Sequence, residues 1–173
     1  GEVLLDIENL QGAQASKNKR YEEAERFLRS ALERARTLQA TYMEASILVN
    51  LGMIRLWRHR YDEAAGFFEN ASRRAGPQFQ MLHSVAQANL AICYSELGEY
   101  DRAIQTSTWS LGVYERIDAK FYLRHSLGET GHIYLLKGEP KSAIPYLQRA
   151  LSIASEMGSA DAALWAGNLS AVY

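Results

Sequence analysis

The chain has 173 residues, of which 47% are hydrophobic and 23% charged, and its 19 basic and 20 acidic side chains leave a net charge of -1. This composition is typical of a folded domain, and the balanced charge argues against a surface for nucleic acid or for an acidic membrane. A single cysteine, Cys93, excludes an internal disulfide, and no apolar run is long enough for a membrane span. We expect a cytoplasmic protein, and we expect the chain to be a fragment, because it begins at Gly1 and ends within a pattern at Tyr173.

Apolar residues recur every three or four positions along the chain, for example at Ala24, Leu28 and Ala31. This spacing forms one face of an α-helix. Gly98 and Gly138 stand where helices should end, as C-terminal caps with positive φ. Pro145 predicts a slight bend within its helix. In chain order the pattern predicts nine helices, near residues 2–17, 21–37, 40–58, 61–75, 78–97, 100–117, 120–137, 140–157 and 160–173.

The helices form a repeat with a period of about 40 residues. Each second helix carries a small residue, and these four alanines follow one another at steps of 40, 39 and 40. Another small residue precedes each alanine by 12 positions, in the first helix of the same repeat. A constant offset predicts that the two helices pack in one fixed geometry through these small residues. The pairs are Gly12 with Ala24, Gly52 with Ala64, Ala91 with Ala103, and Gly131 with Ala143.

The repeat resembles the tetratricopeptide repeat. The motifs that carry the resemblance are Leu51–Gly52, Leu90–Ala91 with Tyr94, and Gly131 with Tyr134 in first helices, and Ala24–Leu28–Ala31, Ala64–Phe68–Ala71 and Ala143–Leu147–Ala150 in second helices. The third repeat departs from the motif at Ser107 and Ser110, and the first at Gln11 and Ala15. Because the family's usual period is about 34 residues, this chain looks like the long-helix variant found in kinesin light chains and in many bacterial regulatory proteins.

The resemblance implies an all-α fold, a right-handed superhelical α-solenoid of antiparallel helix pairs with about nine helices. It also implies a single array over residues 1–173. The repeats would span about 2–38, 40–76, 78–118 and 120–158, followed by a final helix over 160–173.

The resemblance also implies a concave groove lined by the first helices. Asn50, Asn89 and Asn168 stand at the same position in three of these helices, and Glu129 takes this place in the fourth repeat. An asparagine amide both donates and accepts, so it could hold the backbone of an extended peptide. The alternative is that these asparagines bridge neighbouring repeats or solvate the groove. The other groove candidates are Met53, Trp57, Glu96, His125 and His132, and packing between repeats is an alternative for Trp57.

Catalytic motifs for phosphate loops, dinucleotides and nucleophile elbows do not occur in the sequence. His125, Glu129 and His132 share one helix face, but a second Glu-x-x-His motif is missing, so a polar strip is favoured over a metal site. The carboxylate clamp of the family needs Lys and Arg, whereas the equivalent places carry Asn9, Ala13, Val85 and Asn89. We therefore expect neither an enzyme nor a cofactor.

The sequence favours a non-catalytic scaffold that binds a protein or peptide in its groove. The alternative is the sensor or regulatory arm of a larger bacterial signalling protein, such as a transcription regulator or a protease. A metal-dependent enzyme using His125, Glu129 and His132 is a third hypothesis. Self-association through the final helix, which ends in Ala171-Val172-Tyr173, is a further expectation.

Overall fold

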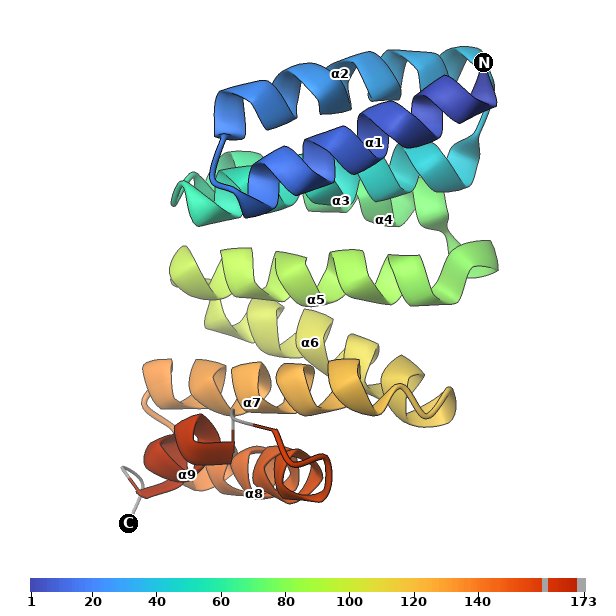
Figure 1. Cartoon of the computed structure of the whole chain (residues 1–173). Coiled ribbons are helices and arrows are strands. Elements are labelled where there is room, and N and C mark those ends of the chain that lie inside the picture. The colour runs from blue at the N-terminus through green and yellow to red at the C-terminus, as the bar shows by residue number, and fades with distance from the viewer. Residues whose placement is uncertain (160–161, 171–173) are drawn as a thin grey trace. The chain divides into compact units, whose positions relative to one another are not determined.

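The computed structural model describes residues 1–159 and 162–170, and all regular structure in these ranges is helical (Figure 1). The bounds of the predicted helices are confirmed to within about two residues, except for the predicted end of the ninth helix, which lies outside the described residues. The helices are α1 (Glu2–Lys17), α2 (Tyr21–Thr37), α3 (Thr41–Trp57), α4 (Tyr61–Ala75), α5 (Gln80–Glu96), α6 (Tyr100–Arg116), α7 (Lys120–Leu136), α8 (Pro140–Glu156) and α9 (Ala162–Ser170), with a 3-10 turn, η1 (Pro77–Phe79), before α5.

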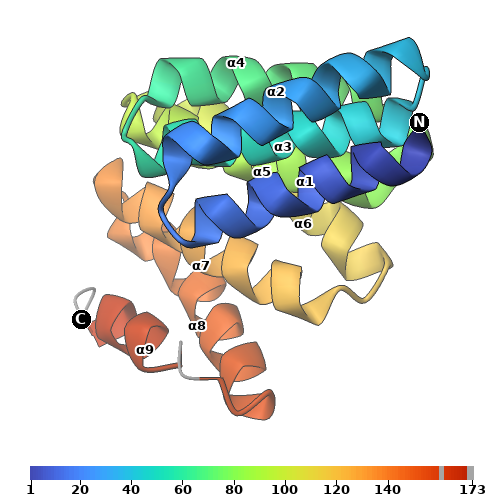
Figure 2. The same cartoon turned by 45° about the horizontal axis from the view of Figure 1, so that its top comes forward.

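The chain forms two compact units, an N-terminal unit of residues 1–93 and a C-terminal unit of residues 94–173, whose boundary lies within α5. In the N-terminal unit, α1 packs antiparallel against α2 and α3 against α4, and α2 also contacts α3 (Figures 1 and 2). In the C-terminal unit, α7 packs against α8, α6 contacts α7, and α9 contacts α8. The fold is thus all-α, built from antiparallel helix pairs. A single superhelical array over residues 1–173 stays a prediction.

In three of the helix pairs, α1–α2, α3–α4 and α7–α8, the helices approach closely at a glycine of the first helix. A Cβ atom added at Gly52 would lie 2.7 Å from the Phe68 ring, and one added at Gly131 would lie 2.7 Å from Leu147. A Cβ atom at Gly12 would lie 2.6 Å from Leu28. Real Cβ atoms do not approach so closely, so these pairs pack at a distance that needs glycine. The small residues of the pattern that are not glycine are all buried: Ala24, Ala64, Ala91, Ala103 and Ala143.

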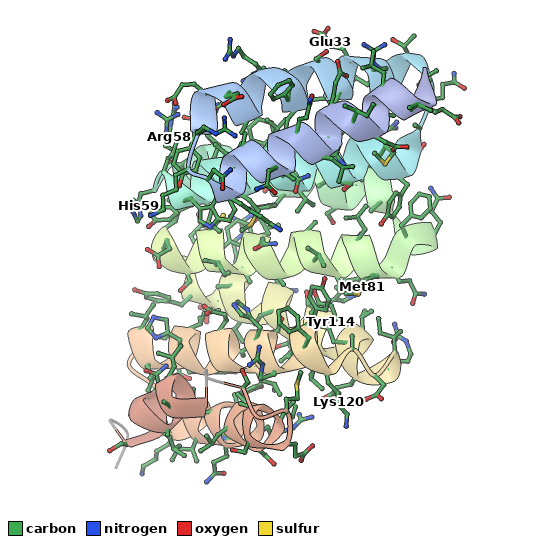
Figure 3. The ribbon with its side chains drawn as sticks, in the orientation of Figure 1. Glu33, Arg58, His59, Met81, Tyr114 and Lys120 are labelled. Carbon is green, nitrogen blue, oxygen red and sulfur yellow. The ribbon has the colours of Figure 1, made fainter. Side chains whose placement is uncertain are left out.

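Most of the described helices are followed by a residue with positive φ. Gly98 and Gly138 have φ of 79° and 83°, as predicted for C-terminal caps. Lys19, Gln39, His59 and Asp118 also have positive φ at the equivalent turns, although they are not glycine. Figure 3 shows His59 and its neighbour Arg58 at the end of α3. The connection from α4 to α5 differs, since Gly76 and η1 replace this turn there. Helix α8 continues through Pro145.

Candidate functional site

In the central part of α3, one helix face stays accessible while the other residues are buried. Between Met43 and Arg55, a stretch that is described throughout, the residues that are not buried are Met43, Ser46, Asn50 and Met53. Their spacing of three and four residues places them on one helix face, and Trp57, which is 45% exposed, continues it. These five residues, the α3 stripe, carry no charge. Their apolar members, two methionines and a tryptophan, are side chains suited to adaptable contacts.

Asn50 connects the α3 stripe to the neighbouring first helix. Its Nδ2 donates to the Oδ1 of Asn9 on α1 at 3.1 Å. This is the bridge between repeats that the sequence left open as an alternative. The Oδ1 of Asn50 and the Nδ2 of Asn9 bond no other residue in the described part of the chain, so the pair keeps one acceptor and one donor. A peptide backbone presents the complementary pair, an N–H and a C=O.

The equivalent stripe of α7 lies in the C-terminal unit. From Leu123 to Ile133, again fully described, the residues that are not buried are His125, Glu129 and His132. We call these three residues the α7 stripe. In the described part of the chain, no group of three or more His, Cys, Asp or Glu side chains is placed to hold a metal ion. His125, Glu129 and His132 therefore share a face without forming a metal centre.

The remaining candidates lie on other first helices. Asn89 is half-buried on α5, and its Nδ2 donates to the carbonyl oxygen of Val85, one turn earlier in the same helix, at 2.9 Å. Glu96 is exposed at the end of α5 and Asn168 is half-buried on α9. The Trp57 ring also approaches the Tyr21 ring, with centroids 6.5 Å apart, so Trp57 is both packed and accessible. That each of these residues binds a ligand stays a prediction.

Sequence reasoning missed the ion pairs that join the helices. The buried Arg55 of α3 donates from Nη2 to Glu25 of α2 at 3.0 Å and from Nε to Glu63 of α4 at 2.9 Å. The hydrogen bond from Arg55 holds the pKa of Glu25 below its usual value. Glu44, also on α3, is paired in the same way with Arg36 and Arg74. These pairs join residues up to 30 positions apart, so no local sequence pattern predicts them.

A family model described as tetratricopeptide repeat matches residues 43–116 and 82–156. Together these ranges cover well over half of the chain. The chain belongs to the tetratricopeptide repeat family. A comparison with curated proteins gives no match.

Solved structures share the fold of this tetratricopeptide repeat chain. BtubC (BKLC) from P. vanneervenii is 23% identical with a TM-score of 0.84, and the match covers 94% of this chain and 68% of that one. The apo form of RapI is 17% identical with a TM-score of 0.85, over 90% of this chain and 57% of that one. A putative kinesin light chain from Podosopora anserina, with nearly identical tetratricopeptide-like repeats, is 13% identical with a TM-score of 0.80, and the match covers 98% of this chain and 84% of that one.

A Rap protein complexed with competence and sporulation factor is 21% identical with a TM-score of 0.66, over 97% of this chain and 52% of that one. This chain therefore spans little more than half the length of the two Rap structures. Tetratricopeptide repeat domains typically bind proteins or peptides and are usually not catalytic. Among the helices that the structure describes, none combines the length and apolar character needed to cross a bilayer.

Proposed function

We propose that the chain is a non-catalytic scaffold whose first helices bind segments of a partner protein, one at the α3 stripe and Asn89 in the N-terminal unit and one at the α7 stripe in the C-terminal unit. The observation that carries the proposal is the accessibility pattern: between Met43 and Arg55 of α3, and between Leu123 and Ile133 of α7, only residues on one helix face are not buried. A helix that packs on most of its circumference offers a ligand only that stripe. The residue types there favour recognition by shape, a few apolar anchors and backbone hydrogen bonds.

The two stripes differ in chemistry, which defines what each can accept. The α3 stripe is uncharged and has the Asn9–Asn50 amide pair at its centre. It suits a segment with apolar side chains and an accessible backbone. The α7 stripe carries one carboxylate, Glu129, between two histidines, so it suits a polar segment with hydrogen-bond donors.

The test begins with a ligand selected from a library of random linear peptides on the purified chain. Asn50→Ala combined with Asn89→Ala should weaken binding of the selected peptide at least about tenfold, which corresponds to about 1.4 kcal/mol. Asn70→Ala is the matched control, because Asn70 is an exposed asparagine on the second helix α4. Unchanged affinity in the double variant, with its circular dichroism intact, would refute the groove role of these asparagines.

A second candidate is the sensor or regulatory arm of a larger signalling protein. It is supported by the fold likeness to RapI and to the Rap protein complexed with competence and sporulation factor, of which this chain spans 57% and 52%. In this case a peptide bound to the first helices would change the activity of an attached effector. The coding sequence downstream of Tyr173 tests it: an effector domain would support this candidate, and a stop codon with no upstream effector would count against it.

A further inference from the structure

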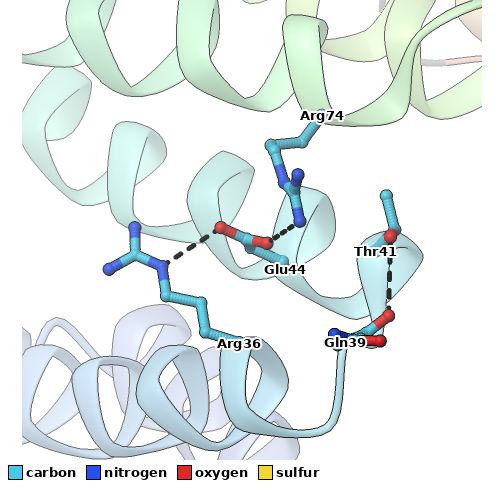
Figure 4. A pocket seen from close by; sticks show the side chains of 5 residues that line it. All are labelled: Arg36, Gln39, Thr41, Glu44 and Arg74. Atoms are coloured by element: carbon cyan, nitrogen blue, oxygen red, sulfur yellow. Dashed lines mark hydrogen bonds and ion pairs between the residues drawn. The ribbon is translucent and has the colours of Figure 1, made fainter.

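A charged pocket lies in the N-terminal unit where α2 ends, α3 begins and α4 ends (Figure 4). Its centre is Glu44, in the first turn of α3, which is only 6% exposed. The Nε of Arg36, on α2, donates to Oε1 of Glu44 at 3.1 Å. Arg74, on α4, donates to the other carboxylate oxygen. One buried carboxylate thus bridges two guanidinium groups from two other helices.

The two arginines leave this pocket with a surplus positive charge. Arg36 and Arg74 together carry two charges, and Glu44 compensates one. Their side chains are 57% and 47% exposed, so both reach solvent. Arg36 uses its Nε and Arg74 one Nη, and their remaining N–H groups bond no other residue in the described part of the chain. Glu44 therefore leaves several strong donors of these two lining arginines unused.

The pocket is large enough for a small anion. Its volume is about 560 Å³, and Gln39 and Thr41 complete its lining beside the two arginines and Glu44. The Gln39 amide and the Thr41 hydroxyl add neutral hydrogen-bonding groups. Figure 4 shows the five side chains, with Glu44 between Arg36 and Arg74.

A purely structural role explains only part of this arrangement. Arg36 and Arg74 lie in the last turns of α2 and α4, where positive charge offsets the helix dipole. However, one guanidinium can satisfy a carboxylate through a bidentate pair. Here Glu44 receives a single bond from each of two guanidiniums, and each keeps much of its donor fork unused.

We propose that this pocket binds an oxyanion, a carboxylate or phosphate group, on the N–H groups of Arg36 and Arg74 that Glu44 leaves unused. Both groups match the planar donor fork of arginine. The proposal does not rest on the function of the α3 and α7 stripes, because none of its residues belongs to them.

The direct test follows the Nε–Hε NMR signals of the arginines in the unmodified chain during titration with inorganic phosphate and, separately, acetate at constant ionic strength. The signals of Arg36 and Arg74 should shift along a saturating curve with one shared dissociation constant. Saturation with phosphate alone identifies a phosphate site, and saturation with both identifies a general oxyanion site. Equal, non-saturating shifts at Arg36, Arg74 and Arg149 would overturn the proposal.

Variants give an independent measurement of the same site. Arg36→Gln and Arg74→Gln should each weaken phosphate binding at least about fivefold, measured at the signal of the arginine that remains. Arg149→Gln is the matched control, since Arg149 is 54% exposed and paired with one carboxylate, Glu115. Equal phosphate affinity in all three folded variants would contradict the proposal.

Discussion

At the residue scale, Tyr114 of α6 has an unusual environment in the C-terminal unit (Figure 3). The side chain is almost completely buried, and its ring stacks on Tyr122 with centroids 5.5 Å apart. Its hydroxyl has no hydrogen-bond partner within the described residues. Burial raises the pKa of this phenol above its usual 10.0. The ring therefore contributes packing, while the hydroxyl carries an uncompensated cost of leaving water.

Replacing Tyr114 by Phe should keep the ring and remove this cost. We expect Tyr114→Phe to leave the free energy of unfolding unchanged or to raise it by up to about 1 kcal/mol, measured by urea titration at pH 8. Because the folded-state pKa is raised, the phenol ionises more readily in the unfolded chain than in the folded one, so the wild-type chain loses stability as the pH rises beyond 10. The variant should therefore lose less stability between pH 9 and about 11. A loss of more than about 1 kcal/mol at pH 8 would show that the hydroxyl has a stabilising partner.

Some backbone conformations and hydrogen-bond partners of single residues could be predicted from the sequence, and others could not. Gly98 and Gly138 predict a left-handed backbone conformation, since glycine adopts positive φ at no steric cost. Lys19 and Gln39 adopt the same conformation without any such signal, because the requirement comes from the packing of the helices on either side. Asn50 and Asn89 were likewise predictable only in part. Their shared register was visible in the sequence, but the partners, Asn9 for Asn50 and Val85 for Asn89, depend on the folded geometry.

At the scale of the element, three helix pairs depend on close contact at a glycine of the first helix. Gly52→Ala would place a Cβ atom 2.7 Å from the Phe68 ring. We expect a loss of about 1–3 kcal/mol in the free energy of unfolding, because a buried aromatic ring must shift. Urea titration followed by circular dichroism measures it.

Gly112→Ala is the matched control, since Gly112 lies within α6 with nothing within 4 Å of an added Cβ. This change should stabilise by about 0.5–1 kcal/mol through helix propensity. Combining Gly52→Ala with Phe68→Leu should recover part of the loss. Equal effects of the two glycine substitutions would refute the close packing of α3 on α4.

The buried Arg55 joins three helices through Glu25 and Glu63. Glu25→Gln leaves Arg55 with weaker compensation, so we expect a loss of about 1–3 kcal/mol at pH 7. The folded-state pKa of Glu25 is lowered from 4.5, so its contribution is present above that pH and disappears as the pH falls through the folded-state pKa. The difference between variant and wild type should therefore shrink towards pH 2 in urea titrations.

Glu22→Gln is the control for this ion pair, because Glu22 is largely exposed and paired at the surface with Arg58. It should change the free energy of unfolding by less than about 0.5 kcal/mol. A loss for Glu25→Gln that is as large at pH 2 as at pH 7 would show that the charge of Glu25 is not what stabilises α3.

At the scale of the whole molecule, the repeat made the fold predictable from the sequence. A helix pair that recurs about every 40 residues, with a fixed offset of 12 between its two small residues, is compatible with few folds other than stacked helix pairs. The bounds of the helices followed from the spacing of apolar residues and from the glycines at helix ends. The 3-10 turn at Pro77–Phe79 was missed because it belongs to a four-residue connection between α4 and α5 that replaces the usual turn. The Arg36–Glu44–Arg74 pocket was missed because its residues come from three helices. The predicted self-association through Ala171-Val172-Tyr173 falls on residues outside those described.

Four methionines allow a direct test of the proposed binding face. Met43 and Met53 belong to the α3 stripe, whereas Met157 is exposed at the end of the second helix α8. Methyl NMR of methionine-labelled chain, titrated with the selected peptide, should shift the Met43 and Met53 signals along one saturating curve and leave Met157 unchanged. A saturating shift of Met157 with Met43 and Met53 unaffected would contradict binding along the first helices.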